Sequence, residues 1–143
     1  MKSSEIIFCK NFEFSDGTKK DKYFIVLNDP QPNQNFLVAL TTSQEFFAGG
    51  TKKRPSTPGC HAPEECFFIA QKTEWFPDPT WVCFNFYEFD QQETLRREQK
   101  GIFNKKSCLG ALKFTQLINC LKWSKDISKE QIKLFSSSVK IPH

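Results

Sequence analysis

The segments EIIFCKNFEF (residues 5–14), KYFIVLN (22–28) and FLVALTT (36–42) decide the fold of this chain. All three are rich in the β-branched and aromatic residues that favour strands. Short polar connections separate them, with Asp16-Gly17 in the first and two prolines in the second. Because such residues reverse the chain, the stretch predicts a three-stranded antiparallel meander.

The three predicted strands differ in the spacing of their apolar residues. Residues 22–28 and 36–42 are apolar almost throughout, which predicts central strands covered on both faces. The first strand alternates instead, and strict alternation gives it one buried face. That face would carry Ile6, Phe8, Phe12 and Phe14.

Further strands are expected at residues 65–71 and 81–89, where apolar and aromatic residues dominate. Beyond Asp90 the period changes. The charged segment 91–100 predicts a short helix with Arg96 and Arg97 in solvent, and apolar residues recur at helical spacing within 108–123.

A last short helix is expected through Phe135, because Ser128 and Gln131 have the spacing of a capping box. We therefore expect one mainly β domain of the α+β class over residues 1–143. Its sheet would be a small SH3-like β-barrel or a strongly curled antiparallel sheet, capped by a C-terminal helix. The barrel would occupy 5–90, the helical cap 91–135, and a frayed tail 136–143.

The composition sets limits on class and location. The net charge of +4 is compatible with a polyanionic partner and with an ordinary solvated surface. The apolar runs are too short to cross a bilayer, and the first residues lead directly into a strand pattern, so a cytoplasmic protein without a membrane partner is expected. Six cysteines without a CxxC pair would then be reduced thiols, and four of them lie within apolar patterns: Cys9, Cys66, Cys83 and Cys120.

No strong catalytic motif is present, since the sequence has no Walker A, GxGxxG, HExxH or GxSxG motif. Cys60-His61 and Cys66 form the only cluster that resembles metal ligands, and a structural zinc site needs four ligands. A buried thiol at Cys66 is the favoured interpretation, and neither a metal nor a cofactor is expected. A cysteine nucleophile would depend on His61, because the other histidine is the last residue.

The meander resembles the MazF/PemK (Kid-like) toxin family. In that family an apolar second strand follows a flexible loop and a basic residue, and a third strand closes on Thr-Ser. The corresponding stretches here are residues 6–12, 19–28 and 37–43. The later strand at 81–89 and the helix at 111–123 are similar to that family's closing elements.

The resemblance implies an SH3-like barrel and a metal-independent endoribonuclease that cuts single-stranded RNA. It also implies an antitoxin protein as partner and a homodimer. The family's catalytic arginine falls on Lys22, and its Thr/Ser pair falls on Thr42 and Ser43. Lysine lacks the bidentate guanidinium of arginine and transfers protons poorly unless burial lowers its pKa.

Cleavage through the neighbouring 2′-hydroxyl needs a base, an acid and a cation. His61 suits the proton transfers because of the usual pKa of imidazole. Five further side chains are candidates for RNA binding by charge or base stacking, together with Arg54. They are Lys20, Lys52, Lys53, Trp75 and Trp81.

The alternative is a non-catalytic barrel that binds RNA or a protein partner through the long loop at residues 44–64. Loops of this length in compact domains are usually functional or disordered. The replacement of arginine by Lys22 favours this reading. Each candidate residue also has a structural interpretation, as a surface charge or a core ring.

Overall fold

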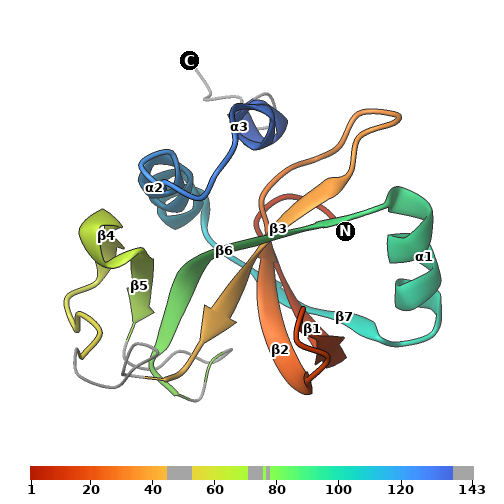
Figure 1. The fold of residues 1–143 in the computed structure, drawn as a ribbon, viewed down its shortest axis with the longest axis horizontal. Coiled ribbons are helices and arrows are strands. Elements are labelled where there is room, and N and C mark those ends of the chain that lie inside the picture. Colours follow the sequence, from red (N-terminus) through yellow and green to blue (C-terminus); the bar gives the residue numbers. More distant parts are fainter. Residues whose placement is uncertain (45–52, 71–75, 77, 137–143) are drawn as a thin grey trace.

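In a computed structural model of the chain, the structure describes residues 1–44, 53–70, 76 and 78–136 (Figure 1). Within these residues, seven antiparallel strands form one sheet in the order β4-β5-β6-β3-β2-β1-β7, which is open rather than closed into a barrel. The strands are β1 (Glu5–Glu13), β2 (Lys19–Val26), β3 (Phe36–Thr42), β4 (Gly59–His61), β5 (Cys66–Ala70), β6 (Thr80–Phe89) and β7 (Phe103–Cys108). The helices are η1 (Ala62–Glu64), α1 (Gln91–Gln99), α2 (Ala111–Leu121) and α3 (Lys129–Ser136).

The mainly β prediction is confirmed, in its curled-sheet form with a helical cap. The meander is also confirmed, because β1 pairs with β2 and β2 with β3, all antiparallel. β3 is the central strand, and all seven of its residues are buried. The Asp16-Gly17 turn forms as expected, with Gly17 in the left-handed region at φ 86°.

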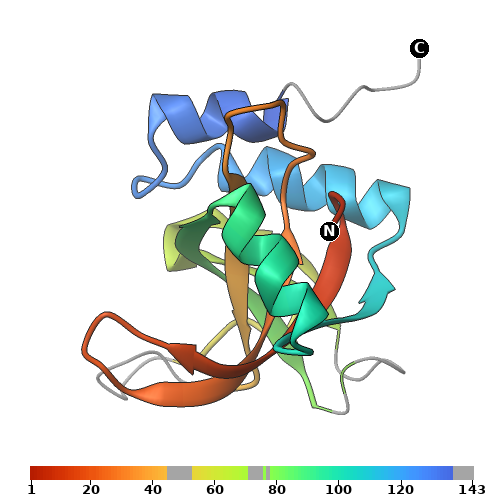
Figure 2. The ribbon, with the colours of Figure 1, turned by 90° about the vertical axis from the view of Figure 1, so that its right-hand side faces the viewer.

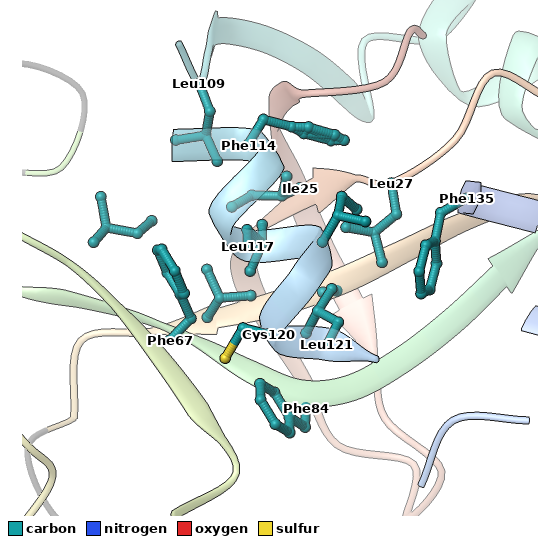
Figure 3. Packing of buried hydrophobic residues seen from close by; sticks show 14 of the residues in the cluster. Ile25, Leu27, Phe67, Phe84, Leu109, Phe114, Leu117, Cys120, Leu121 and Phe135 are labelled. Carbon is teal, nitrogen blue, oxygen red and sulfur yellow. The ribbon is translucent and has the colours of Figure 1, made fainter. Parts of the chain in front are cut away.

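Helix α2 covers one face of the sheet, and Figure 2 shows α3 lying beside it. Phe114, Leu117 and Leu121 project from α2 onto the sheet, where they meet Ile25 and Phe67 (Figure 3). The predicted capping box of α3 is present: the Gln131 amide donates to Ser128 Oγ at 3.0 Å, and the Ser128 amide donates to Gln131 Oε1 at 3.1 Å.

A second apolar cluster fills the opposite face, where the sheet curls. Phe24, Val38 and Phe103 belong to it, with Phe89 packed against them. The Phe24 and Phe103 rings meet edge to face with centroids 5.2 Å apart. β3 is therefore covered on both faces, as its continuous apolar sequence predicts.

The predicted buried face of the first strand is wrong. A β-bulge shifts the register between Cys9 and Phe12, so strict alternation ends there. Phe12 joins the cluster of Ile7 and Cys9, while Ile6 belongs to the cluster beneath α2. One extra residue in a strand reverses the faces of all residues beyond it.

Two strands were not predicted. β4 has three residues, and β7 has a buried Phe103 but otherwise half-exposed or exposed residues. Both lie at sheet edges, where solvated polar residues remove the hydrophobic signal. The region 91–135, predicted as a helical cap, thus also contributes strand β7.

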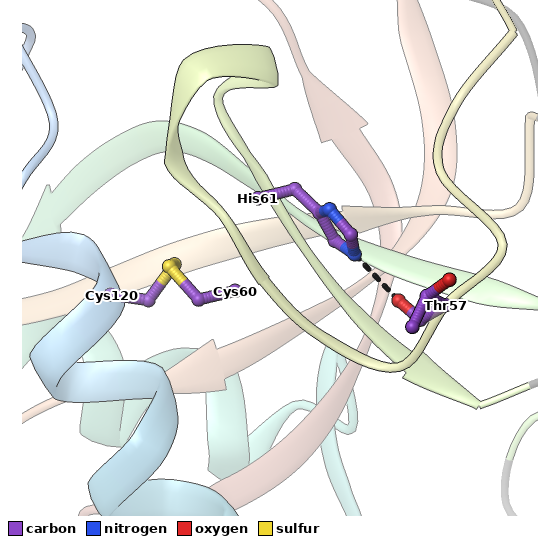
Figure 4. The surroundings of a disulfide bond; sticks show 4 residues. All are labelled: Thr57, Cys60, His61 and Cys120. Atoms are coloured by element: carbon purple, nitrogen blue, oxygen red, sulfur yellow. Dashed lines mark hydrogen bonds between the residues drawn. A yellow bond between two sulfur atoms is a disulfide. The ribbon is translucent and has the colours of Figure 1, made fainter.

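The expectation of six reduced thiols is wrong, because Cys60 and Cys120 form a disulfide (Figure 4). The bond joins β4 to α2, with 5.4 Å between the two Cα atoms. The partners are 60 residues apart in sequence, so no local pattern could reveal them. Cys9 and Cys66 are buried free thiols, as expected.

The disulfide should stabilise the fold by restricting the unfolded chain. For a loop of 60 residues, the chain-entropy relation gives about 4 kcal/mol. Urea unfolding of the oxidised protein, repeated with a thiol reductant, should show this loss. The Cys60→Ala variant is the control: its unfolding midpoint should not respond to reductant, and equal stability of oxidised and reduced wild type would contradict the prediction.

Leu117 should contribute strongly to stability because its side chain is fully buried between α2 and the sheet. We expect Leu117→Ala to lower the free energy of unfolding by about 2–5 kcal/mol. Leu112 lies on the same helix but is 75% exposed, so Leu112→Ala should change it by less than about 0.5 kcal/mol. Urea titration of both variants measures the difference, and similar losses would show that α2 packs differently.

Candidate functional site

The sheet divides where β2 leaves β3. These strands pair over only three residues each, from Phe24 opposite Leu40 to Val26 opposite Val38. Residues 19–23 continue as a ribbon with β1, whereas the end of β3 continues along β6. The two parts point apart in Figure 1, and we call the space between them the fork.

A small hollow of about 190 Å³ occupies the fork. Three residues predicted as catalytic line it together: Lys22 from β2, and Thr42 and Ser43 from the end of β3. The register of β2 and β3, extended by two residues, places Lys22 opposite Thr42. The remaining lining residues are Asp21, Tyr23, Thr41, Phe76, Asp78 and Thr80.

The Lys22 ammonium is half-buried in this fork. Nζ donates to the Thr41 carbonyl at 3.4 Å and lies 5.9 Å from the centre of the Phe14 ring. Burial lowers the pKa of Lys22, and the charges of Lys20 and Arg54 lower it further, while the negative charge of Cys83, when ionised, acts in the opposite direction. A lysine transfers protons well only when burial lowers its pKa in this way.

Two hydroxyl groups face the same hollow. Thr42 Oγ1 accepts the Gln44 amide at 3.1 Å, so its own proton is available to a ligand oxygen. Ser43 is exposed beside it. Thr41 instead donates to the Tyr23 carbonyl at 2.9 Å, which bridges β2 and β3 where regular pairing has ended. The fork thus combines one cation and two hydroxyl donors, which suit an oxyanion, with the carboxylates of Asp21 and Asp78.

Cys83 and Arg54 complete the surroundings of Lys22, and sequence reasoning did not connect them to it. Cys66 and Cys83 are opposite one another on β5 and β6. Burial raises the pKa of both thiols, that of Cys66 to about 11, although the charge of Arg54 acts in the opposite direction. Protonated thiols are poor nucleophiles at neutral pH, and only the folded register could have placed them near Lys22.

His61 does not join this site. It lies on β4, three strand positions from β3, which corresponds to about 14 Å. Its Nε2 donates to the Thr57 carbonyl at 2.6 Å (Figure 4). Cys66 is opposite His61 in the β4–β5 ladder, but its raised pKa leaves it a thiol rather than an activated nucleophile.

The candidate RNA-binding residues are dispersed. Trp81 is 3% exposed, stacks on Phe68 with centroids 4.8 Å apart and donates to the Pro55 carbonyl, so its ring is not available to a base. Lys20 is exposed on β2, and Lys53 is exposed within the 44–64 loop. Lys52 and Trp75 lie outside the described residues.

No group of three or more His, Cys, Asp or Glu side chains that could hold a metal ion occurs among the described residues. Cys60 of the predicted metal-like cluster is used by the disulfide. Within the same part of the chain, none of the helices has the length and apolar character needed to span a membrane.

Comparison with known protein families, with curated proteins and with solved structures finds no significant match to this chain. The resemblance to the MazF/PemK toxins therefore gains no support from them.

The lowered pKa of Lys22 can be measured through its reactivity. Since only the neutral amine is nucleophilic, Lys22 should be acylated at a lower pH than an ordinary lysine. Lys105 is the internal reference, because the Glu5 carboxylate raises its pKa. Competitive labelling followed by mass spectrometry gives the midpoint for each residue, and a Lys22 midpoint at or above that of Lys105 would contradict the assignment.

Proposed function

We propose that this protein is an endoribonuclease that cuts single-stranded RNA in the fork. The observation that supports the proposal is the convergence of Lys22, Thr42 and Ser43 on one hollow. The volume of about 190 Å³ suits a phosphate group rather than a whole nucleotide. The scissile phosphodiester would enter the fork while the bases remain outside.

The proposed reaction is attack of the ribose 2′-hydroxyl on the adjacent phosphorus, with release of the 5′-oxygen. Thr42 and Ser43 would donate hydrogen bonds to the non-bridging oxygens, and the Lys22 ammonium would balance their developing charge. The lowered pKa of Lys22 suits it to protonate the leaving oxygen. Asp21 and Asp78 also line the hollow, and either carboxylate would accept the 2′-hydroxyl proton.

Under this proposal the substrate is cytoplasmic single-stranded RNA, and Lys22 supplies the positive charge that a metal ion provides in other nucleases. Lys20 and Arg54 would attract the RNA backbone toward the fork. An antitoxin protein and a homodimer remain implied by the resemblance alone.

Incubation of the protein with labelled single-stranded RNA in EDTA tests the proposal. Lys22→Met should slow cleavage by about 100-fold or more, and Thr42→Val by about 100-fold. Thr42→Ser should restore activity because it keeps the hydroxyl. Lys122→Met, at an exposed position, should cut like wild type.

A DNA strand of the same sequence is the second control. It lacks the 2′-hydroxyl and should remain intact. Intact RNA with every protein, or cleavage that Lys22→Met does not slow, would reject the proposed function.

The second candidate is RNA or protein binding without cleavage, through the 44–64 loop. The position of His61, away from the fork, favours it because the hollow then has no imidazole. The same assay separates the two functions: a binding module would bind RNA in a salt-dependent manner and leave it intact.

A further inference from the structure

A second hollow, which we call the basic hollow, lies on the other side of the β1–β2 ribbon. Its volume is about 580 Å³, within the range of about 300–1,000 Å³ typical of ligand pockets. Its walls are the β1 segment around Asn11, Lys19 of β2, and the end of α1 with the turn that follows.

Two irregular backbone segments, the β1 bulge and the turn after α1, border the basic hollow. The β1 bulge places Asn11 at φ 52°, and the Asp21 carboxylate accepts its amide at 2.9 Å. Gly101 ends α1 at φ 72°. The Lys10 amide donates to the Ile102 carbonyl at 3.1 Å and joins the two turns. Bulges commonly redirect side chains at functional sites.

The lining is strongly basic. The lining residues include five cationic side chains and two carboxylates. Their net charge is therefore +3, compared with +4 for the whole chain. The five are Lys10, Lys19, Arg96, Arg97 and Lys100. Most of the excess positive charge of the protein is thus concentrated at one concave surface.

Two kinds of cation line the basic hollow. Arg97 is fixed: its Nε donates to Glu93 at 2.8 Å, and its guanidinium lies 5.5 Å from the centres of the Phe89 and Phe103 rings. Arg96 also pairs with Glu93. The amines of Lys10, Lys19 and Lys100 are exposed, and none forms an ion pair with a carboxylate among the described residues.

The basic hollow and the fork belong to the two edges of one ribbon. Cys9, which lines the basic hollow, is paired directly with Lys22, which lines the fork. Neighbouring strands are about 4.8 Å apart, so a short stretch of flexible polymer can cross the ribbon. A rigid duplex would not bend over this narrow edge, whereas an unpaired strand can.

We propose that the basic hollow binds the phosphate backbone of single-stranded RNA, so that the nucleotides beside the scissile bond lie across the β1–β2 ribbon. This inference rests on the proposed function for the identity of the polymer. In this proposal Lys10, Lys19 and Lys100 contact phosphates. Arg97, whose guanidinium is held in place by its partners, forms part of the wall of the hollow. Recognition here is by charge, so it is independent of base sequence.

Fluorescence anisotropy with a labelled single-stranded RNA tests the inference in the Lys22→Met background, where cleavage should be slower by about 100-fold or more. Lys10→Gln, Lys19→Gln and Lys100→Gln, combined, should weaken binding at least about tenfold and reduce the slope of log affinity against log salt by about 2. Arg97 is left unchanged because it supports the packing of Phe89 and Phe103.

The matched control removes the same charge elsewhere, with Lys122→Gln, Lys125→Gln and Lys129→Gln at exposed positions around the end of α2 and the start of α3. This control should bind RNA nearly as wild type does. Equal weakening in both triple variants, or wild-type affinity in the first, would overturn the inference. Thermal unfolding confirms that each variant is folded.

The two proposals fail in different ways. If RNA binds through the three lysines but wild type never cuts it, the proposed cleavage would be rejected and the proposed RNA binding by the basic hollow would stand. If wild type and the triple variant of Lys10, Lys19 and Lys100 cut RNA with the same KM, the proposed cleavage would stand and the proposed RNA binding by the basic hollow would be rejected.

Discussion

Burial of β3 on both faces is the constraint on which the structure depends. All seven residues of the strand are buried, with the apolar cluster beneath α2 on one side and the cluster of Phe24 and Phe103 on the other. The strand must therefore be apolar until its end, where Thr41 and Thr42 can find polar partners. That end is also where β2 diverges. Strand β3 thus contributes to both apolar clusters and, at its end, places threonine hydroxyl groups at the fork.

Local signals in the sequence predicted the elements that local physics determines. The turn at Asp16-Gly17, the apolar stripe of α2 and the Ser128–Gln131 capping box each depend on a few neighbouring residues. The edge strand β7 and the Cys60–Cys120 bond depend on partners far along the chain. The β1 bulge is intermediate, since one extra residue is invisible to periodicity yet reverses the face of Phe12.

The residues of the candidate site also differ in whether local sequence signals could identify them. Lys22, Thr42 and Ser43 could be named because each lies at the end of a recognisable strand, and adjacent ends of a meander lie close together. Only its imidazole chemistry indicates a catalytic role for His61, and the strand order separates it from the fork. No sequence pattern connects Cys83 and Arg54 to Lys22. Their effect on its pKa depends on the pairing of β6 with β3 and on the fold of the chain that brings Arg54 near Lys22.

The positive charges on the β1–β2 ribbon differ in burial, and under the proposed function this difference separates RNA binding from RNA cleavage. The exposed lysines of the basic hollow would act on a polyanion over roughly one Debye length, about 8 Å at physiological salt, and would lose this effect as salt rises. Lys22 is half-buried, so its charge is less screened, while burial lowers its pKa toward the range useful for proton transfer. Under the proposed function, salt would govern how much RNA reaches the ribbon, whereas the protonation state of the half-buried Lys22 amine would govern cleavage in the fork.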